Sequence, residues 1–224
     1  ESATSGSLRD GLRLQSNSYD GTQEPFGLER VEVLRGAASV LYGQLSPGGV
    51  INAISKRPTS TPLRELNVQL GNHDRRQLSA DFSGPVAGSE TLDYRLTMLG
   101  RESNTAQDHI GDGKLYIAPS LTWRPTADTS LTLLSFYQKT NSRFPAPLPY
   151  QLVEGVGSGA FRIGRSDFIG EPSYDKMKGE MFALGYELAH RLSGSTRLSH
   201  KLRYFNARVT RNYLQRPTTA PPTP

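Results

Sequence analysis

The chain has 224 residues, a net charge of +5, a mean hydropathy of −0.51 and no cysteine. The lack of cysteine excludes a disulfide framework and thiolate chemistry, and no apolar run is long enough for a transmembrane helix. Basic residues are dispersed among 21 acidic ones without a run longer than two, so we expect a solvated surface and no nucleic-acid partner.

The first regular elements are expected between residues 28 and 58, where β-branched runs alternate with glycines. "RVEVL" and "VINAIS" are typical of strands, "SPGG" of a turn, and "AASVLY" of a short helix that Gly43 ends in a left-handed cap. The spacing of Gly43 and Gly48 resembles a phosphate-binding loop, but Gly49 and Val50 stand where that loop requires Lys and Ser or Thr. We therefore expect a compact, turn-rich unit that binds no phosphate in this way.

From Leu63 onward, apolar and polar residues alternate with period two, which predicts strands with unlike faces. Seven strands are expected: 64–70, 77–83, 91–99, 114–123, 130–138, 181–190 and 197–205. The polar face of this array carries Asp81, Asp93, Arg95 and Glu187. The pattern leaves the facing of 130–138 open. Four aromatic residues stand near the expected strand ends, where interfacial girdles form: Trp123, Tyr137, Phe182 and Tyr204.

The connections between these strands alternate in length. Long connections at 102–113 and 139–175 share one end of the array, and short turns at 84–90, 124–129 and 193–196 share the other. Outer-membrane barrels have this asymmetry, with short periplasmic turns and long extracellular loops. The pattern favours a transmembrane antiparallel β-barrel over a soluble β-sandwich, which alternates in the same way and stays the alternative.

Motifs for catalysis or metal binding are weak. The four histidines lie in loops or on strands without ligand spacing, and no Ser, His and Asp arrangement sits on a nucleophile elbow. "DHIGDG" is better explained as a plain loop than as a calcium loop. We expect neither an active site nor a metal held by protein ligands.

A resemblance to a known family is carried by "LERVEVLRGAASVLYGQLSPGGVINAISKRP", residues 28–58. This stretch resembles the end of the plug domain of TonB-dependent outer-membrane receptors. "DGLRLQSNSYDGTQEPFGLER" upstream, and "YRLTMLGRESNTAQ" and "YIAPSLTWRPTADTSLTLLSFYQ" downstream, are similar to the ferrichrome and hydroxamate-siderophore receptor group.

The resemblance implies a mainly β protein with two parts. Residues 1–58 would be the C-terminal part of an N-terminal α+β plug domain. Residues 59–224 would be the first strands of a 22-stranded transmembrane barrel with its extracellular loops, a partial barrel of about seven strands. The resemblance also implies that the sequence is a fragment, without the signal peptide, the TonB box, the first half of the plug and about two thirds of the barrel.

The implied function is TonB-dependent uptake, and no enzyme activity is expected. The receptor would bind a ferric siderophore, of hydroxamate type, and import it into the periplasm of a Gram-negative bacterium. Its partners would be outer-membrane lipid and the TonB–ExbB–ExbD complex, and iron would travel within the siderophore. Two alternatives stay open, which are a receptor for another scarce nutrient and a siderophore-sensing signalling receptor. A porin is disfavoured because porins carry no plug.

The resemblance also implies candidate ligand-binding residues. Tyr19 matches a ligand-contacting tyrosine in the apical loop "LQSNSYDG", in which Gln15 would orient the loop. In the related ferrichrome receptor, the third long loop begins with aromatic ligand contacts. The corresponding region here lies in the connection 139–175, where Phe144 and Tyr150 are the nearest aromatic residues. There "SRFPAPLPY" has prolines at the matching positions, so the resemblance does not imply ferrichrome itself as the ligand.

A further set of residues is implied to hold the plug in the barrel. Arg35 matches a plug arginine that pairs with carboxylates on the barrel wall, because a buried guanidinium needs such partners. Arg30, Glu29 and Glu32 would join this network, although a solvated strand face is an equal alternative for these three.

Overall fold

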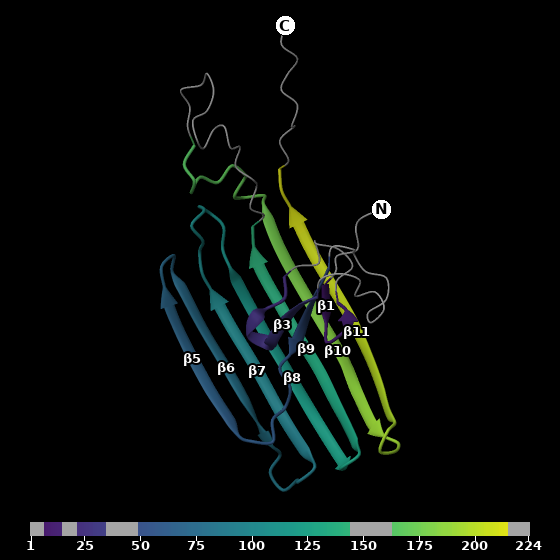
Figure 1. Ribbon diagram of the computed structural model, residues 1–224. Coiled ribbons are helices and arrows are strands. Elements are labelled where there is room, and N and C mark those ends of the chain that lie inside the picture. Colours follow the sequence, from purple (N-terminus) through teal and green to yellow (C-terminus); the bar gives the residue numbers. More distant parts are fainter. Residues whose placement is uncertain (1–6, 15–21, 35–48, 144–162, 215–224) are drawn as a thin grey trace.

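The computed structural model describes residues 7–14, 22–34, 49–143 and 163–214, which form two β-sheets (Figure 1). The small sheet has four strands in the order β2-β1-β4-β3. Its strands are β1 (Ser7–Arg9), β2 (Leu12–Arg13), β3 (Leu28–Leu34) and β4 (Val50–Ser55). Strand β1 runs parallel to β4, and the other pairs are antiparallel. A short 3₁₀ helix, η1 (Pro25–Gly27), precedes β3.

The strands expected from "RVEVL" and "VINAIS" are confirmed as β3 and β4, which pair with each other. The expected short helix, and the turn apart from its last glycine, lie outside the described residues.

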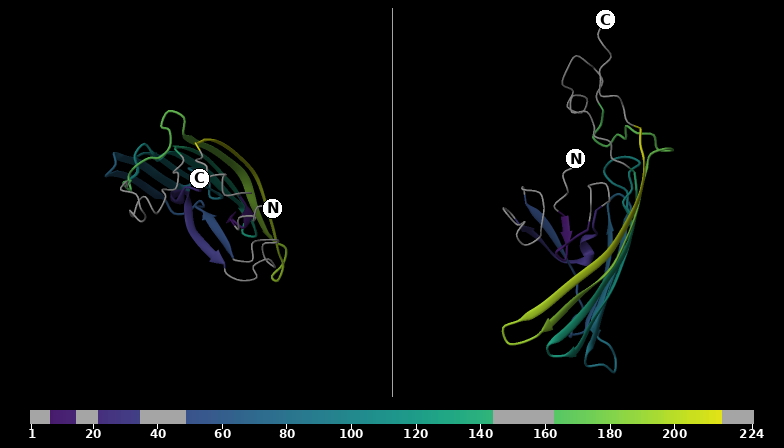
Figure 2. Two further views of the ribbon diagram at one scale, coloured as in Figure 1. Left: turned by 90° about the horizontal axis from the view of Figure 1, so that it is seen from above. Right: turned by 90° about the vertical axis from the view of Figure 1, so that its right-hand side faces the viewer.

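The second sheet, called the wall below, has seven strands within the described residues, and they pair antiparallel in chain order. They are β5 (Leu63–Gly71), β6 (Arg75–Pro85), β7 (Leu92–Glu102), β8 (Gly113–Thr126), β9 (Thr129–Ser142), β10 (Lys176–Arg191) and β11 (Arg197–Asn212). Two further views show that the wall is curved and that the small sheet lies on its concave side (Figure 2). Within the described part of the chain, no helix is long and apolar enough to cross a membrane.

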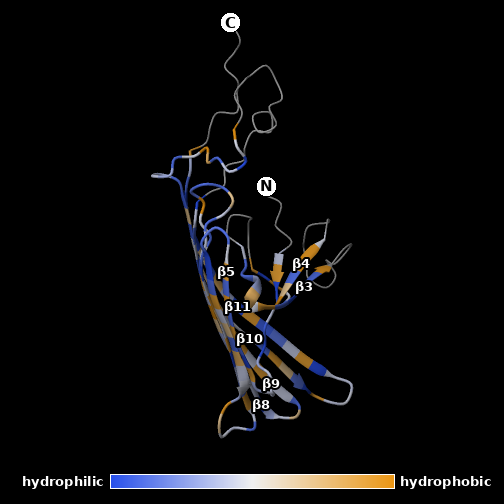
Figure 3. Ribbon diagram, turned by 90° about the vertical axis from the view of Figure 1, so that its left-hand side faces the viewer, coloured by the Kyte–Doolittle hydropathy of each residue, from blue (hydrophilic) through white to orange (hydrophobic). Residues whose placement is uncertain are grey.

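The two faces of the wall differ as the alternating sequence predicts, and the alternation is visible along the strands (Figure 3). The side chains that point away from the small sheet are largely apolar and exposed, among them Leu66, Val68, Leu78, Trp123, Leu133, Leu184 and Leu202. Those that point toward the small sheet include many buried polar groups, among them Asp81, Asp93, Arg95, Thr97, Thr122 and Gln138. On β9, whose facing the pattern leaves open, Phe136 and Gln138 are buried and face inward.

The strands β10 and β11 are longer than the sequence predicts, with 16 residues each. Phe182 and Tyr204 therefore lie in the middle of these strands, and Tyr137, opposite Phe182, lies five residues from the end of β9. None of the three is at a strand end, which corrects the sequence-based expectation. Backbone pairing continues past the rings of Phe182 and Tyr204 through outward positions that are polar, such as Lys178 and Thr210. The rings, whose centroids are 6.5 Å apart, stand where the outward face changes from apolar to polar.

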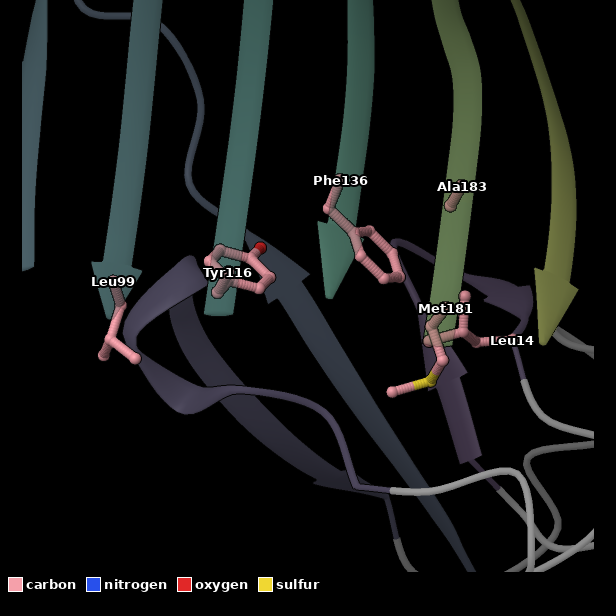
Figure 4. Packing of buried hydrophobic residues seen from close by; sticks show 6 residues of the cluster. All are labelled: Leu14, Leu99, Tyr116, Phe136, Met181 and Ala183. Carbon is pink, nitrogen blue, oxygen red and sulfur yellow. The ribbon is translucent and has the colours of Figure 1, made fainter. Parts of the chain in front are cut away.

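An apolar cluster forms part of the contact between the two sheets (Figure 4). Its buried members are Leu14, Leu99, Tyr116, Phe136, Met181 and Ala183. Leu14 follows β2 of the small sheet, whereas the others come from four neighbouring wall strands. The rings of Tyr116 and Phe136 are stacked, with centroids 6.1 Å apart. Among the described residues the cluster has six buried side chains, and polar contacts add to it across the same interface.

Gly27, at the end of η1, is buried against the ring of Tyr116, and a Cβ atom at residue 27 would overlap the Tyr116 hydroxyl. Gly27→Ala should therefore displace Tyr116 and cost about 1–3 kcal/mol, as overpacking of a tight contact does. The measurement is thermal unfolding of the complete receptor. Gly100→Ala is the matched control, because a Cβ at Gly100 meets nothing within 4 Å. Equal unfolding midpoints for the two variants would contradict the tight contact.

Candidate functional site at the seam between the two sheets

A seam of charged side chains joins the small sheet to the wall. It consists of Arg9, Asp10, Lys56 and Arg57 from the small sheet and the segment after it, and of Asp81, Arg95, Glu187, Lys201 and Arg203 from the wall. A tight turn between β1 and β2 stands at its centre. Asp10 and Gly11 both have positive φ angles, 53° and 82°, and two-residue hairpin turns of this kind favour the Asp-Gly pair.

The turn aims the Asp10 carboxylate at the wall. Its Oδ2 accepts a hydrogen bond from Arg203 Nη2 on β11 at 2.8 Å. Within the small sheet, Oδ1 accepts a bond from the Ser55 backbone amide at 2.8 Å, and Oδ2 accepts one from the Ser55 hydroxyl at 2.7 Å. Arg57, just after β4, donates to the carboxylate at 3.3 Å. Because Asp10 is only 2% exposed and has several charge-assisted donors, it links β1, β4 and the wall as a single anion.

Arg57 bridges onward to a second carboxylate on the wall. Its Nη2 atom lies 2.9 Å from both oxygens of Glu187 on β10. Glu187 also pairs with Lys201 of β11 at 3.0 Å, and the Lys201 ammonium donates to the Asp10 carbonyl at 3.1 Å. The small sheet is thus held at β10 and β11 by a continuous chain of ion pairs.

Asp81 on β6 is the third carboxylate of the seam, and it has no exposed surface. Arg95 of β7 donates to it through Nε at 2.9 Å and through Nη2 at 2.8 Å, a bidentate pair. The Lys56 ammonium donates to it from the segment after β4 at 2.8 Å. Arg95 Nη1 in turn donates to the Arg57 carbonyl at 2.8 Å. Asp81 and Arg95 together therefore bind both a side chain and the backbone of this segment.

A separate polar contact fixes the start of η1. The Gln138 side chain on β9 accepts from the Glu24 amide at 3.0 Å and donates to the Thr22 carbonyl at 2.8 Å. The Glu24 carboxylate caps η1 by accepting from the Phe26 amide at 3.2 Å and also pairs with Lys114 of β8 at 3.3 Å. Both Glu24 and Gln138 are buried, so neither is a solvated surface group.

Comparisons with known proteins relate this arrangement to a family. Residues 1–50 match the model of the TonB-dependent receptor plug domain. The chain is 34% identical over 215 residues to the ferrichrome outer membrane transporter/phage receptor of Escherichia coli K12, covering 95% of this chain and 28% of that protein. It is 32% identical to the ferrioxamine B receptor of Salmonella typhimurium, covering 91% of this chain and 29% of that protein.

The chain belongs to the TonB-dependent receptor family. It spans somewhat less than a third of the length of these relatives. Among solved structures, the siderophore receptor PiuA of Acinetobacter baumannii matches with a TM-score of 0.79 at 26% identity, over 94% of this chain and 29% of that one. The ferric-catecholate import receptor Fiu of E. coli K12 matches with a TM-score of 0.84 over 92% of this chain and 32% of that one; at 19% identity it supports the fold alone.

Family membership identifies the two sheets of this TonB-dependent receptor. The small sheet is plug structure, and the seven-stranded wall is part of an antiparallel β-barrel in the outer membrane. Strands of outer-membrane barrels carry an apolar face toward lipid and a polar face toward the lumen, and the wall has both kinds of face. The family is one of receptors and transporters, not of enzymes. The division into domains at residue 58 stays a prediction.

Three of the four residues that the resemblance assigns to the plug–barrel contact are described, and one of them, Glu29, lies beside the seam. Glu29 is half exposed, with its carboxylate 3.6 Å from Arg95 on the wall. Arg30 and Glu32 pair with each other along β3 at 2.8 Å. The hydrogen bond from Arg30 lowers the pKa of the Glu32 carboxyl most, and the hydrogen bond from Asn52 lowers it further. The role of the three residues in the plug–barrel contact stays a prediction.

The remaining predicted site residues lie outside the described residues. They are Gln15, Tyr19, Arg35, Phe144 and Tyr150.

Most of the seam is not predictable from the sequence. Lys56 and Arg57 appear in the pattern only as the flank of a strand, although two cations directly after an apolar strand are a signal for acidic partners. The pair Asp10 and Gly11 is a hairpin-turn signal that could have located β1 and β2. Glu24 and Gln138 are 114 residues apart in the chain, so nothing local in the sequence relates them.

Asp81→Asn should destabilise the receptor by about 3–5 kcal/mol, because it leaves the Arg95 and Lys56 cations in the seam without their carboxylate. The thermal unfolding midpoint of the complete receptor measures this. Asp128→Asn is the control, since the Asp128–Arg191 pair is exposed (53% and 64%) and contributes little. If both variants unfold at the wild-type temperature, the buried pair does not hold the seam.

Proposed function

We propose that the complete protein is an outer-membrane receptor that binds a ferric siderophore, of hydroxamate type, and imports it into the periplasm. One observation carries the proposal: a plug sheet is ion-paired to the concave face of a barrel wall whose outward face is apolar. The names of the ferrichrome and ferrioxamine B relatives support the class of ligand.

A docked plug is a reason to propose gated uptake and not diffusion. A folded sheet on the inner face of a barrel obstructs its lumen, so a solute passes only when the plug is remodelled. The seam suits such remodelling, because water can solvate separated ions but not a newly exposed apolar surface. We propose that the TonB–ExbB–ExbD complex supplies the energy, as membership of a TonB-dependent family supports.

The ligand site is proposed at the end of the barrel that bears the long connections. The segment that contains Gln15 and Tyr19 starts after Leu14, which packs in the apolar cluster. It ends before Thr22, whose carbonyl accepts from Gln138 on β9. The two described residues that flank this segment, Leu14 and Thr22, therefore both contact the wall.

The segment that contains Phe144 and Tyr150 starts at the same wall. Arg143, directly after β9, donates to the carbonyls of His109 and Pro172 at 2.6 and 3.3 Å. These bonds join the two long connections of the wall at one end. We propose that the aromatic side chains of both segments contact the siderophore, because aromatic rings cover its apolar shell and a tyrosine hydroxyl can bond a hydroxamate oxygen.

Iron is proposed to enter as cargo chelated by the siderophore. No group of three or more His, Cys, Asp or Glu side chains among the described residues could hold a metal ion. Recognition of the whole chelate by rings and hydroxyl groups needs no such group. No covalent bond in the ligand has to form or break, so the proposed activity is transport.

A second candidate ligand class comes from one relative. The metal-pseudopaline receptor of Pseudomonas aeruginosa is 30% identical over 182 residues, covering 80% of this chain and 24% of that protein. The alternative proposal is uptake of another metallophore by the same mechanism.

The experiment measures uptake of radioactive iron or another metal by an iron-starved strain that lacks its own receptors and expresses the complete protein. Purified ferrioxamine B, ferrichrome, a ferric catecholate and metal-loaded pseudopaline are supplied in turn. Uptake of a hydroxamate chelate that stops when TonB is deleted is the expected result. Uptake of pseudopaline alone would favour the alternative, and uptake that continues without TonB would contradict both.

With the transported chelate in hand, Tyr19→Ala should weaken its binding by about 1–3 kcal/mol, the loss of an aromatic contact and a hydrogen bond. Tyr19→Phe should lose less, since it keeps the ring. Tyr94→Ala is the control, because Tyr94 is exposed on the outward face of the wall. Wild-type affinity in Tyr19→Ala would remove Tyr19 from the site.

A further inference from the structure

Arg9, the last residue of β1, is buried in the seam without a carboxylate of its own. It is 2% exposed. Its Nε donates to the Ser55 hydroxyl at 2.8 Å and its Nη2 to the Tyr116 hydroxyl at 3.0 Å. The guanidinium lies over the ring of Phe136, 4.2 Å from its centroid. Each of these partners is neutral, so none of them compensates the charge of Arg9.

One nitrogen of Arg9 lacks even a neutral partner. Within the described part of the chain, the buried Nη1 atom has no hydrogen-bond acceptor. An unmade hydrogen bond at a buried charged donor costs free energy comparable to the desolvation of that group. Native proteins seldom leave such a donor empty, so an atom that accepts a hydrogen bond is expected beside Nη1.

The charge balance of the seam indicates the sign of that missing group. The seam has six cations and three carboxylates, since its residues are Arg9, Lys56, Arg57, Arg95, Lys201 and Arg203 against Asp10, Asp81 and Glu187. Each carboxylate pairs with two of the other five cations, and none accepts a bond from Arg9.

Three further acids stand beside the seam, and none of them bonds to Arg9. Glu29 is half exposed and lies beside Arg95, and Glu65 is exposed and stands opposite Asp81 on the neighbouring strand. Glu24 is buried, but it pairs with Lys114 at 3.3 Å and with Arg101 at 3.5 Å. The excess of positive charge therefore persists when these neighbours are included.

A small cavity adjoins this unpaired charge. Three cations line it, Arg9, Lys56 and Arg203, and so do the hydroxyl-bearing residues Ser55 and Ser120. Ser120 donates only a long bond, 3.5 Å, to the Arg95 carbonyl, so its hydroxyl can turn to the cavity. Asp10 also lines the cavity, and both of its carboxylate oxygens already accept hydrogen bonds.

The size of the cavity limits what it can hold. Its enclosed part has room for about one water-sized species. A monatomic ion therefore fits it better than a polyatomic one.

We propose that this cavity binds one monatomic anion, chloride, beside Arg9 Nη1. A water molecule would accept the hydrogen bond but leave the excess positive charge of the seam uncompensated, whereas an anion does both. The ion is a structural part of the docked plug and is distinct from the siderophore site. It joins Arg9 of the small sheet to Arg203 of the wall, two cations that would otherwise repel each other.

Crystals of the complete receptor soaked in sodium bromide test the site directly, because bromide replaces chloride and scatters anomalously. The expected result is an anomalous peak within hydrogen-bonding distance of Arg9 Nη1, and its loss in crystals of Arg9→Met. A wild-type map without a peak in the cavity would overturn the proposal, as would a peak that persists in Arg9→Met. A carboxylate from the rest of the receptor bonded to Nη1 would overturn it as well.

Thermal unfolding gives a second readout that needs no crystal of the variant. The wild-type midpoint should rise as chloride replaces gluconate at constant ionic strength, since a ligand that binds only the folded state stabilises it. Arg9→Met should lose this rise. Arg191→Met, which removes an exposed arginine at the end of β10, should keep it. A rise of the same size in all three proteins would be a general salt effect and would contradict a specific site.

Discussion

The burial of ionised side chains between plug and wall is the constraint on which the rest of the structure depends. Removing a carboxylate or a guanidinium from water is costly, and the cost is recovered only with close, well-oriented partners. Asp10 and Asp81 meet this condition by accepting from cations on both sides of the seam. These bonds couple the positions of the elements that carry the charges, because a shift of any element leaves a charge on its partner unpaired. The elements are β1, the segment after β4, β6, β7 and β11.

This constraint is compatible with the proposed function, in which a docked sheet has to be released. An apolar interface of the same extent would resist exposure to water in proportion to its area. Here the apolar contact is a cluster around Tyr116 and Phe136, and the charged seam lies beside it. In the proposed mechanism a pulling force opens the seam, and water then solvates the separated ions. A charged seam therefore favours a plug that moves as a unit when driven and returns to one register afterwards.

The wall is predictable from the sequence, because alternation with period two indicates a sheet with one apolar and one polar face. The lengths of β10 and β11 are not predictable in this way, since backbone pairing continues where the alternation of hydropathy has ended. The short strands β1 and β2 escape prediction because two or three residues carry no period. The docking contacts join residues such as Glu24 and Gln138 that are distant in the chain, and only the fold relates them.

The coupling between Asp10 and Arg203 is the most direct test of a plug held by buried ion pairs. Hydrogen exchange of the β4 amides in the complete receptor reports the free energy of opening the small sheet, and a double-mutant cycle with Asp10→Asn and Arg203→Met isolates the pair. Asn keeps the turn, because it tolerates the positive φ of residue 10. A pair that holds the seam should give a coupling of about 1–3 kcal/mol. Effects that add within about 0.3 kcal/mol would contradict that role.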